Sequence, residues 1–467
     1  MSTAIKQKKD LTEGKILPKI IIFALPLIAT GILQLLFNTA DTIVVGRWGG
    51  ATPEEREIAL GAVGSCGALI SLIISLFMGL SVGAGVCVAH DIGAKRYEEV
   101  EKTVHTSVLT ALIASVFVTA LGLIFAEEFL ILMGIEKSLL PQATLYMRAF
   151  FCGMPANMLY NYCASILRSA GDTTRPLIFL SVAGVVNVIL NIVLVLGFAI
   201  PGALGVGVAT AASQWISCIL VVIFMCRTNG PCKLSLKKLR IDRKKFQKIV
   251  AIGLPAGIQS ALFSVSNVII QSAIHSLESA TVVAANTAAA NIDNFIYIGM
   301  NSFAASAMTF TGQHVGARKY KRLKKVVFWH ILLVISSGVL MGGLAYIFGR
   351  PLIGLFSPSN TEIADFGMIR LGIIGISYFL CGIMDTLCST LRGFGKSIMP
   401  MIVSLVGACL SRIIWIFTVF YPFFPNDIAV LYASYPITWF LTSSVFLVFL
   451  IIELRKHKSE EIQLEIE

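Results

Sequence analysis

Apolar stretches of about 20 residues recur along the whole chain, and each is long enough to cross the hydrocarbon core of a bilayer as one helix. The 467 residues are 56% hydrophobic and only 13% charged, whereas soluble domains carry about 25% charged residues. We therefore predict an all-α polytopic membrane protein. The stretches predict 12 transmembrane helices, at residues 18–46, 60–90, 105–134, 141–166, 176–200, 203–226, 249–277, 282–313, 327–355, 366–391, 398–421 and 429–453.

The basic residues predict how these helices are oriented. Thirty of the 37 Lys and Arg residues fall in the N-terminus, the C-terminus and alternate loops. The positive-inside rule assigns such segments to the cytoplasm. We therefore expect an even number of spans, both termini in the cytoplasm, and a multi-pass protein of the cell membrane. Because this topology accounts for the net charge of +11, we expect the lipid bilayer as a partner and no nucleic acid.

Three sequence motifs occur twice, in the same order, and the second copies follow the first after 223, 224 and 229 residues. Six predicted spans separate the copies, and because six is even the two halves have the same orientation in the membrane. We predict two six-helix bundles related by a pseudo-twofold axis: an N-terminal lobe at 1–227, a basic cytoplasmic linker at 228–248 and a C-terminal lobe at 249–467. The paired motifs are Gly-Ala-Lys-Arg-Tyr at 93–97 and Gly-Ala-Arg-Lys-Tyr at 316–320, Leu-Arg-x-x-Gly at 167–171 and 391–395, and Leu-Pro at 25–26 and 254–255.

The first predicted helix carries one carboxylate, Asp41, in an otherwise apolar run. Thr30, Gln34 and Asn38 precede it at helical spacing, so all four lie on one face. A charge in hydrocarbon costs several kcal/mol, roughly 3 on insertion scales, and normally faces a polar interior or a substrate path. We interpret Asp41 as a titratable group in an outward-opening cavity, the alternative being an acid at the outer helix end.

Gln34, Asn38 and other polar residues of the spans are candidates to line such cavities. Asparagine pairs four residues apart lie in the fourth and fifth spans, a threonine lies in a small-residue run of the sixth, and two amides lie in the seventh. Structural packing of the asparagines is an alternative, because polar side chains also bond across membrane helices. The other candidates are Asn157, Asn161, Asn187, Asn191, Thr210, Gln259 and Asn267.

The second half lacks an acid at the position that matches Asp41, which is Ile270. Asp385 in the tenth span is instead a second candidate for an ion or substrate role, with a local salt bridge to Arg412 as the alternative. We interpret Asp293 as a residue near an outer helix end.

Motifs that would indicate catalysis are missing from the sequence. We find no P-loop, no nucleophile elbow and no cluster of metal-ligating residues, and the ten cysteines form no Cys-x-x-Cys pair. We therefore expect that the protein is not an enzyme and needs no cofactor.

Taken together, the motifs resemble the multidrug and toxic compound extrusion family of cation-coupled exporters. The resemblance covers essentially the whole chain and rests on the three paired motifs, on Asp41 and on Asn187-Val-Ile-Leu-Asn191. It implies two six-helix bundles arranged as a V that rock between outward-open and inward-open states. It also implies that organic cations or other amphiphilic small molecules leave in exchange for H⁺ or Na⁺.

The resemblance also implies roles for individual residues. Asp41 is similar to the acid that takes up the coupling ion, with Pro26 where the first helix bends and Pro255 as its repeat. Asn187 and Thr210 are similar to its polar partners, and Asp385 to a tenth-span acid implicated in coupling, so Na⁺ is a possible ligand of Asp41 or Asp385. Asn191 stands where many members carry an aspartate, which favours a proton over Na⁺ at Asp41.

Two alternatives stay open. One is a flippase or exporter of lipid-linked or polysaccharide substrates of the same superfold, for which we expect about fourteen spans or a more cationic cavity; here only Arg148, Arg370 and Arg412 could face inwards. The other is a membrane-embedded enzyme or receptor. We expect a monomer that binds small amphiphilic or cationic molecules.

Overall fold

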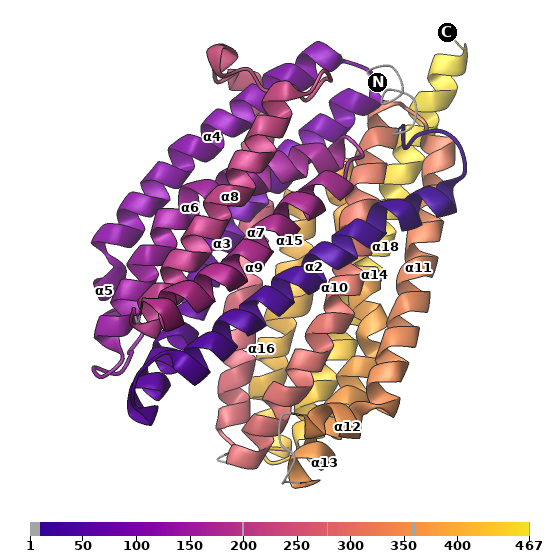
Figure 1. The fold of residues 1–467 in the computed structure, drawn as a ribbon. Helices are drawn as coiled ribbons and strands as arrows, with labels where there is room; N and C mark the ends of the chain where they lie inside the picture. Colours follow the sequence, from indigo (N-terminus) through magenta and orange to yellow (C-terminus); the bar gives the residue numbers. More distant parts are fainter. Residues whose placement is uncertain (1–9, 199, 278, 356–360, 467) are drawn as a thin grey trace. The chain divides into compact units, whose positions relative to one another are not determined.

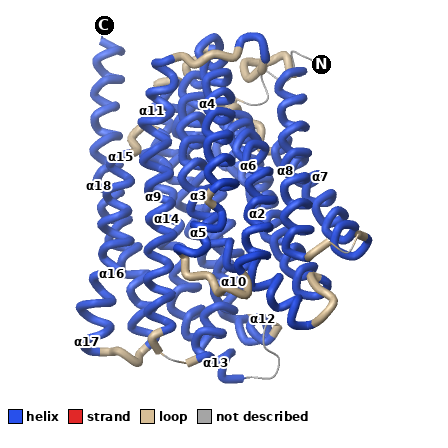
Figure 2. Tube along the Cα trace, turned by 90° about the vertical axis from the view of Figure 1, so that its left-hand side faces the viewer, coloured by secondary structure: helices blue, strands red, loops and turns tan. Residues whose placement is uncertain are grey.

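The computed structural model describes residues 10–198, 200–277, 279–355 and 361–466, and all regular secondary structure in these ranges is helical. Figure 1 shows the path of the chain, and Figure 2 shows how short most connections between the long helices are. The first half contains α2 (Ile16–Trp48), α3 (Pro53–Gly93), α4 (Tyr97–Ile124), α5 (Ala126–Leu132), α6 (Leu140–Ser169), α7 (Thr174–Ile192), the π-helix η1 (Val193–Gly197), α8 (Gly202–Arg227) and the 3₁₀ turn η2 (Leu236–Lys238).

The second half contains several helices that are broken into α- and π-helical parts. Its elements are α9 (Arg243–His275), α10 (Ala280–Gly316), α11 (Tyr320–Ile347), α12 (Gly349–Gly354), α13 (Thr361–Arg370), η3 (Leu371–Gly375), α14 (Ile376–Gly393), α15 (Ile398–Ser404), η4 (Leu405–Leu410), α16 (Ser411–Trp415), η5 (Ile416–Phe420), α17 (Tyr421–Phe423) and α18 (Ile428–Ile466).

Ten helical segments of the described chain are long and apolar enough to cross a membrane. The fold is therefore that of an all-α polytopic membrane protein, as predicted. The predicted spans 141–166 and 282–313 correspond to α6 and α10, which are long enough but are not among the ten. α6 packs against α4 and α8, and α10 packs against α11 and α14. Because these helices face protein, they need less apolar surface, and the number of 12 spans stays a prediction.

Contacts divide the chain into two compact units. The first contains Ala29–Ile92 and Arg96–Gly257, and the second contains Asp10–Ile28, Gly93–Lys95 and the chain from Ile258 onward. The boundary between the units therefore falls inside α2 and inside α9, the first long helix of each half. In both helices it lies two residues after the proline, and the two boundary positions are 229 residues apart. The lobes predicted from the sequence repeat, 1–227 and 249–467, have other boundaries than these two units. The lobes therefore stay a prediction.

The paired motifs also share their backbone conformation. Lys95 and Arg318, the third residues of the two Gly-Ala turns, have φ angles of 57° and 55°. Gly171 and Gly395, which end the two Leu-Arg-x-x-Gly turns, have φ angles of 88° and 85°. A left-handed residue costs roughly 1–2 kcal/mol for any residue other than glycine. Lys95 and Arg318 adopt this costly conformation at matched positions of the two halves, which supports a structural repeat.

In the first unit, α3 and the beginning of α9 approach so closely that only glycine fits. A Cβ atom at Gly79 would lie 2.1 Å from the backbone nitrogen of Gly257, and one at Gly83 would lie 2.2 Å from the carbonyl oxygen of Ile249. Since lipid tails are as apolar as side chains, close packing of this kind is a main source of association between membrane helices.

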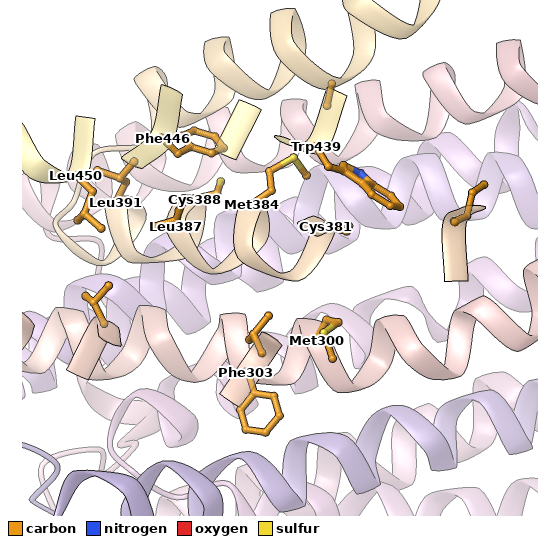
Figure 3. Close-up of a cluster of buried hydrophobic side chains, with 14 of the residues drawn as sticks. Met300, Phe303, Cys381, Met384, Leu387, Cys388, Leu391, Trp439, Phe446 and Leu450 are labelled. Carbon is orange, nitrogen blue, oxygen red and sulfur yellow. The ribbon is translucent and has the colours of Figure 1, made fainter. Parts of the chain in front are cut away.

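The second unit has a core in which α14 lies between α10 and α18 (Figure 3). Met300 of α10 and Trp439 and Phe446 of α18 are buried in this core, whereas the buried ring of Phe303 points to the other side of α10. The α14 side chains in this core are Cys381, Met384, Leu387, Cys388 and Leu391. Hydrogen bonds fix the segment that enters this unit before α2: Thr12 donates to Asp10 Oδ1 at 2.8 Å and 2.7 Å. Burial raises the pKa of Asp10, but these bonds and the nearby charges of Lys319 and Lys19 together leave that pKa below its usual value.

Candidate cation and substrate sites

The Asp41 carboxylate in α2 is held by side chains of α7 and α8, all within the first unit. Asn191 Nδ2 donates to Asp41 Oδ1 at 2.5 Å, and Thr210 Oγ1 donates to Asp41 Oδ2 at 3.2 Å. Asn187 completes the group, because its Oδ1 accepts from Asn191 at 3.3 Å and its Nδ2 donates to Thr210 at 3.5 Å. The structure thus brings together four of the residues predicted from the sequence.

The surroundings of this carboxylate are polar but uncharged. Asp41 is half-buried, Asn187 and Asn191 are buried, and no ion pair to Asp41 is found in the described part of the chain. The Oδ1 atom of Asn191 is buried and accepts no hydrogen bond. A carboxylate held by neutral donors next to a free acceptor keeps its charge uncompensated, and therefore has chemistry suited to a proton or a small cation.

The other polar residues of the first half do not join this group. Gln34 and Asn38 are exposed on α2, and Thr30 is half-buried one to two turns earlier. Asn161 donates to the backbone oxygen of Asn157 at 2.9 Å and to its Oδ1 at 3.0 Å. These two asparagines line a small recess with Ile74, Phe77, Met78, Met154, Met158 and Tyr162.

In the second unit, the predicted residues are separated from one another. Gln259 accepts from Arg392 Nη2 at 2.7 Å and donates to Ser404 Oγ at 2.8 Å, whereas Asn267 is exposed. Asp385 is half-buried and makes no hydrogen bond or ion pair with the residues described. The salt bridge to Arg412 offered as an alternative is therefore not formed.

The interpretation of Asp293 as a helix-end residue is wrong. Asp293 is 2% exposed, and its Oδ2 pairs with Arg370 Nε at 2.9 Å. Arg370 also donates to Asn286 Oδ1 at 2.7 Å, and Tyr432 donates to the same oxygen at 3.0 Å. Sequence reasoning missed this network, although a charged residue inside each of two predicted spans was a signal for it.

Pro26 and Pro255 each lie inside a helix that continues through the proline. Proline lacks the N–H group that would bond to the preceding turn. Both helices therefore lack one backbone hydrogen bond next to the point where the two compact units divide them.

These features define a class: an all-α, multi-pass membrane transporter with an internal repeat and a polar carboxylate site among its helices. In the described residues there is no group of three side chains of the types that hold metal ions. The chain belongs to the MatE family, the multidrug and toxic compound extrusion transporters, whose family model matches it twice, at residues 26–193 and 255–418. Members of this family are transporters and not enzymes, and the double match confirms the internal repeat.

Relatives and solved structures agree with this assignment. A probable multidrug resistance protein of Bacillus subtilis, YoeA, is 27% identical over 391 residues, 82% of each chain. The probable multidrug resistance protein NorM of Thermotoga maritima is 25% identical over 410 residues, 87% of this chain and 86% of the relative. An FAD transporter of Shewanella oneidensis is 23% identical, covering 80% of this chain and 82% of the relative. A solved outward-facing MATE family transporter matches with a TM-score of 0.89 and 19% identity over 97% of this chain and 99% of its own, which shows the fold.

Proposed function

We propose that this chain is a cation-coupled antiporter that exports amphiphilic small molecules by alternating access, with Asp41 as the coupling acid. The observation that carries the proposal is the bonding of one carboxylate on α2 to neutral donors on α7 and α8. The names of relatives include multidrug resistance proteins and an FAD transporter. We therefore keep the substrate class broad, with organic cations and drugs among the substrates.

The hydrogen bonds of Asp41 suggest how an ion would change the conformation. Both carboxylate oxygens accept hydrogen bonds, and a proton added to Asp41 removes the negative charge that strengthens both bonds. This weakens the attachment of α2 to α7 and α8. A ligand shifts a conformational equilibrium only by its different affinities for the two states, and loss of these bonds supplies such a difference.

A proton is the coupling ion that this group favours. Sodium is bound by several oxygen ligands, and the group around Asp41 contains one carboxylate, two amides and a hydroxyl. Each amide oxygen is a weaker partner for Na⁺ than a second carboxylate would be. The lipid-linked alternative instead expects a cationic cavity, and nothing in this group of residues favours it.

We expect Asp41→Asn to abolish dye efflux from cells while folded protein stays in the membrane, because an amide cannot take up the ion. The measurement is the loss of a fluorescent cation from preloaded cells. Asn38→Ala is the matched control, since Asn38 is exposed one turn earlier on α2, and it should export like the wild type. Export by the Asp41 variant at the wild-type rate would contradict the proposal.

We also propose that the chain is a monomer of the cell membrane with both termini in the cytoplasm. The distribution of basic residues supports this orientation. Alkaline phosphatase, which is active only outside the cytoplasm, should be inactive when fused after the C-terminus and active when inserted in the loop after α2. The reverse pattern would contradict the orientation.

A further inference from the structure

The second unit contains a cation deep in a transmembrane segment, where such charges are rare. Arg412 lies 14 residues into the segment Ile398–Phe423, about 21 Å from its start at 1.5 Å per residue. Its residue is only 3% exposed. An arginine in this position normally marks a substrate or ion path, with a partner that can be named.

Arg412 is only partly satisfied in this structure. Its Nε donates to Thr438 Oγ1 at 3.1 Å, and its guanidinium carbon lies 4.2 Å from the ring centre of Tyr435 and 5.6 Å from that of Trp439. Its Nη2 atom is buried without an acceptor, and no carboxylate pairs with it among the residues described. A buried, charged donor without an acceptor is unfavourable, so an acceptor from outside would stabilise it.

A row of aromatic rings connects Arg412 to the surface of the unit. Tyr435 lies 5.6 Å from Trp439, Trp439 lies 5.3 Å from Tyr378, and Tyr378 lies 6.5 Å from Tyr297, between ring centres. Tyr297, at the end of the row, is 37% exposed. These spacings suit stacking and edge contacts between the rings, so aromatic surface extends from the guanidinium to the exposed ring of Tyr297.

In the sequence repeat, Arg412 lies between the positions that match the two asparagines of the Asp41 group. The residues 224 positions after Asn187 and Asn191 are Ser411 and Trp415, which flank Arg412. Arg412 itself matches Val188, so the second half carries a guanidinium on the segment that, in the first half, supplies neutral amides to Asp41. Two π-helices, η4 and η5, border Arg412 on either side, and π-helical segments frequently occur at functional sites.

We propose that Arg412 and the aromatic row form a subsite for the carboxylate or phosphate group of an aromatic amphiphile. This subsite rests on the proposed export function and narrows the substrates to include molecules with an anionic end. Asp385 interacts electrostatically with Arg392 and, more weakly, with Arg412, and it therefore competes with the ligand for Arg412. The aromatic row favours a small aromatic molecule over the headgroup of an anionic lipid.

The test is equilibrium binding of carboxyfluorescein, an aromatic carboxylate, to the purified full-length protein in phosphatidylcholine nanodiscs. We expect Arg412→Gln to raise the Kd at least tenfold, as loss of a charged hydrogen bond does, and Arg412→Lys to raise it less. Arg350→Gln is the matched control, because Arg350 is exposed and pairs with Asp365 at the surface. Binding of the cation rhodamine 6G should stay within about twofold of the wild type in all three variants.

Asp385→Asn gives a result of opposite sign and does not depend on the folding of the Arg412 variants. It should lower the Kd for carboxyfluorescein, because a competing carboxylate is removed. An unchanged Kd in Arg412→Gln, an equal loss in Arg350→Gln, or weaker binding in Asp385→Asn would each overturn the proposal. Loss of dye binding when phosphatidylglycerol is added to the nanodiscs, seen in the wild type only, would overturn it in favour of a lipid headgroup.

Failure of this subsite can be told apart from failure of the proposed function. Binding is measured without an ion gradient, so it does not depend on coupling at Asp41. Wild-type protein that exports rhodamine 6G but does not bind carboxyfluorescein overturns the subsite and leaves the export function standing.

Discussion

The carboxylates of Asp41, Asp293 and Asp385 differ in the partner that compensates each of them. Asp41 is held by an amide and a hydroxyl, Asp293 by the guanidinium of Arg370, and Asp385 by no hydrogen bond in the described residues. Removing one partner of a buried ion pair typically costs about 3–5 kcal/mol, so the Asp293–Arg370 pair is suited to holding helices together. Among the residues described, Asp41 and Asp385 both lack a charged partner, but only Asp41 is bonded to donors of two other helices, so uptake of an ion at Asp41 can change how helices are joined.

A substitution at residue 191 tests whether the lack of a second carboxylate beside Asp41 sets which ion it exchanges. Asn191→Asp places a second carboxylate beside Asp41, and two carboxylates with neighbouring oxygens bind Na⁺ better than one. We expect the variant to be stimulated by Na⁺ roughly tenfold more than the wild type, which corresponds to about 1.4 kcal/mol of cation binding. The measurement is efflux at fixed pH with and without Na⁺. Equal responses of the two proteins would argue against the role assigned to Asn191.

Four of the candidate site residues could be found from sequence because helical periodicity and small residues indicate which faces meet. Asn187 and Asn191 lie one turn apart on α7, and both face Asp41. Gln34, Asn38 and Asn267 are exposed and lie outside this group, so their assignment as cavity residues stays a prediction. Sequence reasoning missed the Asp293–Arg370 pair, because periodicity carries no information on contacts between residues 77 positions apart.

At the scale of elements, close contacts between helices depend on glycine. The crossing of α3 and α9 places Gly79 and Gly83 against the backbone of Gly253 and Gly257. A methyl group there would need a shift of backbone rather than of a flexible side chain.

We expect Gly79→Ala to lower the stability of the protein by about 1–3 kcal/mol, the usual range for overpacking. Gly67→Ala is the matched control on the same helix, because a Cβ atom at Gly67 would meet nothing within 4 Å. Thermal unfolding in detergent is the measurement. Equal melting temperatures for the two variants would mean that the crossing is looser than described.

At the scale of the whole molecule, hydropathy predicted the class of fold because every span that faces lipid must be apolar. It did not separate lipid-facing helices from protein-facing ones, and α6 and α10 are therefore less apolar than the other long helices. The repeat was visible in the sequence because its turns need particular residues, such as the glycines at 171 and 395 with positive φ angles. Contacts between helices far apart in the sequence leave no such trace.

The central claim is that uptake of an ion by Asp41 drives export, and transport by the purified protein tests it most directly. Proteoliposomes loaded with a fluorescent cation are given an imposed pH gradient and, separately, a Na⁺ gradient. We predict dye export driven by the pH gradient in the wild type and none in Asp41→Asn. Export by the Asp41→Asn protein at the wild-type rate, or wild-type export that responds to neither gradient, would contradict the claim.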